Sequence, residues 1–163
     1  MSNGTKVKKR DGRIEALDLE KMHLMVEEAT RGLAGVSASQ VEMKSGIQFY
    51  DGITTAEIQE ILIKAASDLI DLDHPNYQFV AARLLLFALR KQLYGKMREL
   101  PHLESHIMSC TNIDVYDKGI FDKYSKEEID RANSFIDHER DFLFTYAGLR
   151  QVVDKFLGQD RSG

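Results

Sequence analysis

Cysteine is almost absent from this 163-residue chain, which has only Cys110. A disulfide needs two thiols and a four-thiolate zinc site needs four, so both are excluded. Nothing in the cysteine content requires an oxidising compartment. The sequence therefore predicts a cytoplasmic protein without covalent crosslinks.

Long apolar segments are also missing. The stretch from Met1 to Lys6 lacks the apolar core of a signal peptide. The longest apolar runs elsewhere are too short to cross a bilayer. We expect a soluble protein with no membrane partner.

The chain has no overall excess of positive charge, because its formal net charge is −4 and its pI is about 5.7. A protein that neutralises many phosphates usually has a high pI, so no nucleic-acid partner is expected. A phosphate loop of the G-x-x-x-x-G-K-[ST] kind is missing as well, which argues against P-loop hydrolysis. With 43% hydrophobic and 29% charged residues, the composition is that of one globular domain, with or without an appendage.

Against this acidic background, residues 5–13 are strongly basic, with five cations and one anion. Asp11-Gly12 is a turn signal, so Lys6–Lys9 and Ile14–Leu17 are predicted to pair as a short hairpin. A local reversal of charge favours an anionic ligand. A solvated basic turn is the alternative.

Helical periodicity dominates the rest of the chain. Helices are predicted at Leu19–Thr30 with Asp18 as N-cap, from Ser37 toward Tyr50, from a Thr54–Glu57 capping box onward, and over Tyr77–Tyr94. Gly95–Pro101 is predicted as a linker, followed by helices at about Pro101–Thr111, Ser125–Asp137 and Phe144–Phe156. The later helices have modest apolar faces, so residues 96–163 are expected to lie against further protein.

Arg83 stands out in the Tyr77–Tyr94 helix, which is apolar almost all round. An unpaired buried charge is costly, so this cation should find a carboxylate or carbonyl partner. We expect a structural brace rather than a ligand contact.

Several motifs together resemble the ATP-cone, the regulatory nucleotide-binding domain at the N-terminus of ribonucleotide reductase large subunits. Further similarity to the aerobic, class I enzyme extends the resemblance over essentially the whole chain. The motifs are Val7-x-Lys9-Arg10-Asp11-Gly12, Glu15, Leu19-x-Lys21-Met22, Thr55-x-x-Ile58, Ala81-Ala82-Arg83, Leu89-Arg90-Lys91-x-x-Tyr94-Gly95, Ile47–Ile53, Pro75-x-Tyr77-Gln78 and Asp137–Asp141.

The resemblance implies a mainly α fold, a four-helix bundle capped by a small β-hairpin or three-stranded lid. Residues 1–95 would form the ATP-cone, and residues 96–163 a short helical extension leading into an absent catalytic domain. The last residues, from Gly158 to Gly163, resemble a turn in the middle of the family sequence. We therefore expect a truncated gene, a split gene or an expression fragment.

The resemblance also implies ATP or dATP as an allosteric effector, with room for Mg²⁺ on its phosphates. Lys9, Arg10, Lys21 and Lys91 would meet the phosphates, while Glu15 and Thr55 would read adenine. Asp18 and Gln59 would lie beside the sugar. The apolar residues that would line the base or ribose, each equally well explained as ordinary core, are Val7, Leu17, Met22, Ile58 and Phe87.

Three positions depart from the pattern that the resemblance implies. Many bacterial class I members carry histidine at positions 59 and 88 and asparagine at 18, where this chain has Gln59, Ala88 and Asp18. The first two replace groups that hydrogen-bond near the nucleotide. Feedback inhibition by dATP is expected to be weak or lost.

By the same resemblance, the region would control the reduction of ribonucleotides to deoxyribonucleotides for DNA replication. Its partners would be the catalytic domain of the large subunit, the radical-generating small subunit and further copies of the large subunit. One cysteine cannot supply the three thiols of the reaction, so no residue here is expected to be catalytic. It also excludes the zinc ribbon of an ATP-cone repressor. The alternative is a helical interaction module that binds no nucleotide, or a degenerate cone.

Two histidine groups are weaker candidates. His102 and His106 are four residues apart, a spacing that can hold a metal, but no third ligand is evident and a solvated pair is favoured. An acid–base role is conceivable for His138, Glu139 and Asp141. Ion pairing of residues 139–141 with a neighbouring domain is favoured. Cys110 is expected to serve in packing.

Overall fold

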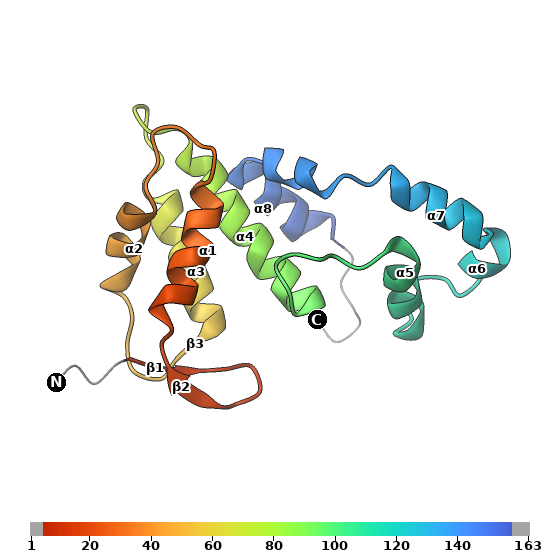
Figure 1. The fold of residues 1–163 in the computed structure, drawn as a ribbon, viewed down its shortest axis with the longest axis horizontal. Coiled ribbons are helices and arrows are strands. Elements are labelled where there is room, and N and C mark those ends of the chain that lie inside the picture. Colours follow the sequence, from red (N-terminus) through yellow and green to blue (C-terminus); the bar gives the residue numbers. More distant parts are fainter. Residues whose placement is uncertain (1–4, 158–163) are drawn as a thin grey trace.

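The computed structural model describes residues 5–157, which form a helical molecule with one small sheet (Figure 1). No helix within this range is long and apolar enough to cross a membrane. In chain order the elements are β1 (Lys6–Lys8), β2 (Ile14–Ala16), α1 (Leu19–Thr30), α2 (Ala38–Gly46), β3 (Ile53–Thr54), α3 (Thr55–Ser67), α4 (Tyr77–Tyr94), α5 (Leu103–Asn112), α6 (Ile120–Lys123), α7 (Lys126–Ser134), the 3₁₀ helix η1 (His138–Leu143) and α8 (Tyr146–Lys155).

The predicted hairpin is confirmed and forms part of a three-stranded sheet. Strand β1 is central, antiparallel to β2 and parallel to β3. Gly12 has a φ of 85°, a conformation that glycine adopts without a Cβ clash, so the turn can be tight. Val7 and Ile53 face inward and are buried, so the sheet closes one end of the helical bundle.

The four predicted helices of the bundle form, three of them with the bounds or caps expected from the sequence. Asp18 Oδ1 accepts a hydrogen bond from the Lys21 backbone N–H at 2.9 Å, and Thr54 and Glu57 make the predicted capping box of α3. Helix α4 ends at Gly95, whose φ of 70° provides a left-handed cap. These local signals set the helix ends that later surround the site.

Helix α2 is shorter than predicted, because it ends at Gly46 instead of continuing toward Tyr50. Ile47, the first residue after the helix, is 86% exposed. The chain must leave the helix early to reach the sheet, where the Asp51 carboxylate accepts from the Lys6 N–H and the Gly52 N–H donates to the Lys6 carbonyl, both at 2.8 Å. Strand pairing therefore overrides the helical pattern.

Arg83 is confirmed as a brace. Its Nη1 donates to the carbonyls of Ala29 and Arg31, at 3.2 and 2.7 Å, where α1 ends. Burial lowers the pKa of Arg83, as expected for a charge held among apolar neighbours.

The C-terminal helix α8 returns to the bundle and packs along α4, as Figure 1 shows. Leu149 is 4% exposed and belongs to the main core, with Tyr146 and Val153 beside it. Arg150 also pairs with Glu60 of α3 at 3.1 Å. The prediction that residues 96–163 lie against further protein is therefore corrected in part, because α8 packs against the bundle itself.

Residues 98–137, which we call the arm, extend away from the bundle between α4 and η1 (Figure 1). The arm contains α5 and α7 within the predicted ranges, both shorter than expected, and the unpredicted helix α6. Asp141 in η1, expected to pair with a neighbouring domain, instead pairs with Arg90 of α4 at 2.7 Å. The sequence of η1 carries no helical periodicity, so this element was also unpredicted.

Candidate functional site

A cleft of about 380 Å³ lies where the sheet meets the bundle, a volume within the range of small-molecule sites. Three helix ends surround it: the beginnings of α1 and α3 and the end of α4. Its lining comes from all these elements and the hairpin, namely Val7, Lys9, Arg10, Asp11, Ala16, Leu17, Asp18, Lys21, Met22, Met25, Thr55, Ile58, Gln59, Lys91 and Gly95.

Two cations reach the cleft from the hairpin. Arg10 Nη1 donates to the carbonyl of Lys91 at 2.8 Å, which fastens the hairpin to the end of α4. Lys9 Nζ lies 3.5 Å from a carboxylate oxygen of Glu15 on β2. Both contacts are weak surface interactions, so either cation can be redirected to an anionic ligand.

Lys91 experiences the charge of the whole cluster. Burial lowers its pKa, and Lys21, Arg10 and Lys9 lower it further by repulsion. Such mutual repulsion means that four cations from three separate segments are close to one point. An anion placed among them would relieve the repulsion and favour the charged form of Lys91.

The N-termini of α1 and α3 add to the positive potential of the cleft. Asp18 and Lys21 belong to the first turn of α1, and Thr55 is the first residue of α3. Helix N-termini carry partial positive charge and free N–H groups, which favour anions. The carboxylates of Asp11 and Asp18 also line the cleft, so the site contains charges of both signs but is mainly cationic.

Apolar side chains form the remaining wall. Val7, Met25 and Ile58 are buried, while Leu17 and Met22 are partly exposed. Gln59 is 8% exposed and lines the same cleft, so it offers an amide at this wall. A cationic end with an apolar wall suits a ligand that combines phosphates with a flat ring.

The cleft brings together all of the residues predicted from the sequence except Glu15 and Phe87. Glu15 lies at the hairpin, paired with Lys9 and with Arg13. Phe87 is 1% exposed and packs edge-on against Phe142 of η1, 6.1 Å between ring centroids, so it belongs to the core. Ala88 also packs against the core and is not part of the lining.

Four lining residues were not identified from the sequence: Asp11, Ala16, Met25 and Gly95. Met25 follows Met22 and Lys21 on the same face of α1, a spacing that could have indicated it. Gly95 required the fold, because only the position of the α4 C-terminus brings it to the cleft.

Residues 5–92 match the family model of the ATP cone domain. The chain belongs to the ATP cone domain family. The matched range contains the sheet, α1 to α3 and all but the last two residues of α4, and thus every lining residue of the cleft except Gly95.

The ATP cone and the segment after it are also similar to part of several larger proteins. The chain is 46% identical over 161 residues to ribonucleoside-diphosphate reductase 1 subunit alpha of Escherichia coli, covering 99% of this chain and 21% of that protein. It is 40% identical over 156 residues to the subunit alpha of Enterobacteria phage T4, covering 94% and 20%. The chain thus spans about a fifth of the length of the curated relatives it matches.

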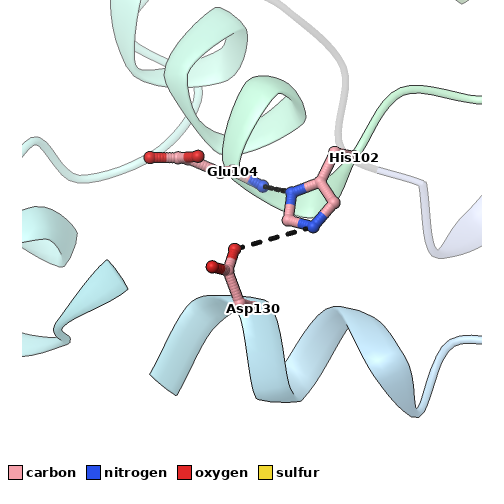
Figure 2. Close-up of side chains that lie close together, drawn as sticks. All are labelled: His102, Glu104 and Asp130. Atoms are coloured by element: carbon pink, nitrogen blue, oxygen red, sulfur yellow. Dashed lines mark hydrogen bonds and ion pairs between the residues drawn. The ribbon is translucent and has the colours of Figure 1, made fainter. Parts of the chain in front are cut away.

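Outside the ATP cone, His102, Glu104 and Asp130 lie close enough together to suggest a metal site (Figure 2). His102 Nδ1 accepts from the Glu104 backbone N–H at 3.3 Å, and Nε2 faces an Asp130 oxygen at 3.6 Å. An accepting Nδ1 places the proton of a neutral ring on Nε2, which then has no lone pair for a metal. The group is best explained as a cap of α5 linked to α7.

His106 does not join His102, with which it was considered as a metal pair. Its two ring nitrogens lie 3.4 Å from the hydroxyls of Tyr94 and Tyr116. Cys110 Sγ is 3.7 Å from the same ring, which places it in this aromatic cluster.

His138 Nδ1 lies 3.8 Å from Asp141, whose carboxylate is shared with Arg90. Neither group faces the cleft.

Proposed function

We propose that the ATP cone binds the triphosphate of ATP or dATP in the cleft and acts as a regulatory region of a ribonucleoside-diphosphate reductase. The observation that carries the proposal is the convergence of Lys9, Arg10, Lys21 and Lys91 on one cleft. These cations come from the hairpin, α1 and α4, so the fold concentrates charge that the sequence disperses. The family match and the similarity to reductase alpha subunits support the same function.

Recognition of adenine would fall to the end of the cleft with the apolar wall. Thr55 has a hydroxyl at the first turn of α3, and Ile58 lies one turn later on the same face. Glu15 can contribute only if the hairpin moves it from Lys9, because it does not line the cleft. We propose that Glu15 reads adenine after such a movement.

Within the proposal, the nucleotide acts by changing contacts of the region with the rest of the large subunit, with the radical-generating small subunit or with further copies of the large subunit. Mg²⁺ would enter on the phosphates, which supply most of its ligands in such sites. Asp18 and Gln59 are positioned at the cleft. With Gln59 rather than histidine, we propose that ATP and dATP bind alike.

Calorimetric titration of the 163-residue chain with ATP and with dATP in magnesium buffer tests the binding. Saturable binding is expected, and Lys91→Ala and Lys9→Ala should each weaken it about tenfold or more, because a charge-assisted hydrogen bond contributes about 1.5–3 kcal/mol. Lys64→Ala is the matched control, since Lys64 is exposed near the C-terminal end of α3, outside the cleft, and pairs with Asp68. Equal affinity of Lys91→Ala and the parent would show that the site is elsewhere.

Base and sugar selection need separate titrations. Glu15→Gln should narrow the preference for ATP over GTP if Glu15 reads adenine, while leaving the phosphate contribution in place. Gln59→His should separate the affinities for ATP and dATP. Sizing of each mixture shows whether the nucleotide changes the oligomeric state.

A further inference from the structure

Arg90 joins the two ends of the arm at the last turn of α4. Its side chain is 7% exposed, and Nη1 donates to the carbonyl of Met97, just before the arm, at 3.4 Å. Nη2 donates to the carbonyl of His138, just after the arm, at 3.3 Å, and to Asp141 Oδ2 at 2.7 Å. One guanidinium therefore holds both the exit and the return of the chain.

The same face of α4 receives the ring of Phe142. Arg83, Phe87 and Arg90 follow at i, i+4 and i+7, so they form one stripe. The guanidinium carbons of Arg83 and Arg90 lie 5.4 and 5.5 Å from the Phe142 centroid, within cation–π range. Phe87 meets the ring edge-on. Helix η1 is thus fixed to α4 by charge and packing together.

The other side of this turn belongs to the cleft. Lys91 follows Arg90 directly and lines the cleft, and its carbonyl accepts from Arg10 Nη1 at 2.8 Å and from the Gly95 N–H at 3.0 Å. Gly95 lines the cleft too, and Met97, two residues later, is held by Arg90. Residues 90–97 are therefore shared by the cleft and by the base of the arm.

We propose that residues 90–97 couple nucleotide occupancy of the cleft to the attachment of the arm, with Arg90 as the positioning residue. This inference rests on the proposed function, since it takes the cleft to hold a nucleotide. A phosphate at Lys91 relieves the repulsion among the cations and orders the end of α4. An ordered turn presents Met97 and the Arg90 guanidinium in the geometry that holds His138 and Asp141.

The coupling is reciprocal by thermodynamic linkage: what the nucleotide does to the arm, the arm does to nucleotide affinity. An attached arm therefore tightens nucleotide binding, and a loosened arm weakens it. Through this turn, a partner that touches only the arm would sense the nucleotide in the cleft.

Hydrogen–deuterium exchange of the 163-residue chain tests the coupling directly. Saturating ATP is expected to slow exchange of the amides of residues 138–144 about fivefold, the lower range of known couplings. Asp141→Asn should weaken ATP binding by a similar factor, about fivefold, and abolish the slowing. Asp154→Asn, the same change at an exposed carboxylate of α8, is the matched control and should leave both unchanged.

Unchanged or faster exchange of residues 138–144 with ATP bound would overturn the coupling while leaving the proposed function intact. Absence of ATP binding by the folded parent would overturn both. If circular dichroism shows that Asp141→Asn is unfolded, the exchange of the parent with and without ATP still decides. A merely structural role of Arg90 would not make that exchange depend on ATP.

Discussion

The bundle and the arm use apolar residues in opposite ways. Helices α1 to α4 with α8 bury a continuous core that includes Val26, Leu62 and Val80. In the arm only Ile107, Thr111 and Ile129 are buried, while Tyr124 and Phe135 are exposed, the latter at 79%. Since buried apolar area is the main source of stability, we expect the bundle to be stable by itself and the arm to depend on its attachment.

The largest expected effect would test whether the two regions unfold separately. Leu62→Ala empties a site that is completely buried in α3 and should cost about 2–5 kcal/mol. Ile129→Ala, in the arm, should leave the main urea transition unchanged because the arm contributes little to that core. The fully exposed Leu72 provides the control Leu72→Ala. Equal losses at positions 62 and 129 would show one cooperative unit.

Removal of the Arg90 guanidinium should release the arm from the bundle. Arg90→Gln leaves Asp141 and two carbonyls without their charged donor, a loss of about 1–3 kcal/mol, and should speed limited proteolysis within residues 98–137. Arg13→Gln is the matched control, because Arg13 forms an exposed ion pair with Asp11 in the hairpin, away from the arm, and its loss should stay within about 0.5 kcal/mol. Equal cleavage rates of the two variants would contradict the role of Arg90.

Lys91 shows that the bundle, unlike the arm, contains charge that opposes its own folding. The folded-state pKa of Lys91 lies below its ordinary value, so its charged form is disfavoured in the folded chain. Lys91→Gln should therefore leave the melting temperature unchanged or raised at neutral pH while weakening ATP binding. A lowered melting temperature would indicate that Lys91 stabilises the fold.

The pH dependence of this group has opposite signs for stability and binding. As pH rises through the lowered pKa of Lys91, the unfavourable charge is lost, so this group's penalty on the free chain is relieved. ATP prefers the charged form, so its affinity should fall over the same range. Lys91→Arg should keep affinity to higher pH, and Lys64→Arg, outside the cleft, should not. Titrations from neutral to alkaline pH measure both.

The smallest expected effect is on the pH dependence of stability. It can be compared between one histidine pair in the bundle and one in the arm. The hydrogen bond that the Glu42 carboxylate accepts raises the pKa of His23, which links α1 and α2. Its stabilisation should be complete below the ordinary histidine pKa and lost as pH rises through the raised value. Glu42→Gln should remove this dependence from the main transition. Asp130→Asn, which breaks the His102 pair of the arm, should leave the main transition unaffected.

Much of the bundle could be predicted because its signals are local. Capping residues such as Asp18 and Thr54, the apolar repeat of α3 and the turn at Asp11-Gly12 act within a few residues of their position. The end of α2 could not be predicted in this way, because the pairing of β3 with β1 decides it across more than forty residues. Helix η1 was missed for another reason, since its six residues carry no helical periodicity.

The candidate cleft divides along the same line. Resemblance to a known family pointed to its cations, and the structure places Lys9, Arg10, Lys21 and Lys91 around one cleft. The sequence left open whether Phe87 lines the base or belongs to the core, since one face of α4 looks like another when the whole helix is apolar. Only the docking of Phe142 shows that this face meets η1.

By itself, the sequence determined most of the long helices, the caps of α1 and α3, the hairpin and the charge available to bind an anion, because each depends on neighbours along the chain. Tertiary structure decided which cations share a cleft, that α8 completes the bundle and that Arg90 holds both ends of the arm. These depend on contacts between distant segments, and local pattern carries no record of which segments meet. The end of α4 depends on both. A local signal stops the helix at Gly95, and the tertiary structure places Lys91 in the cleft and Arg90 at the arm.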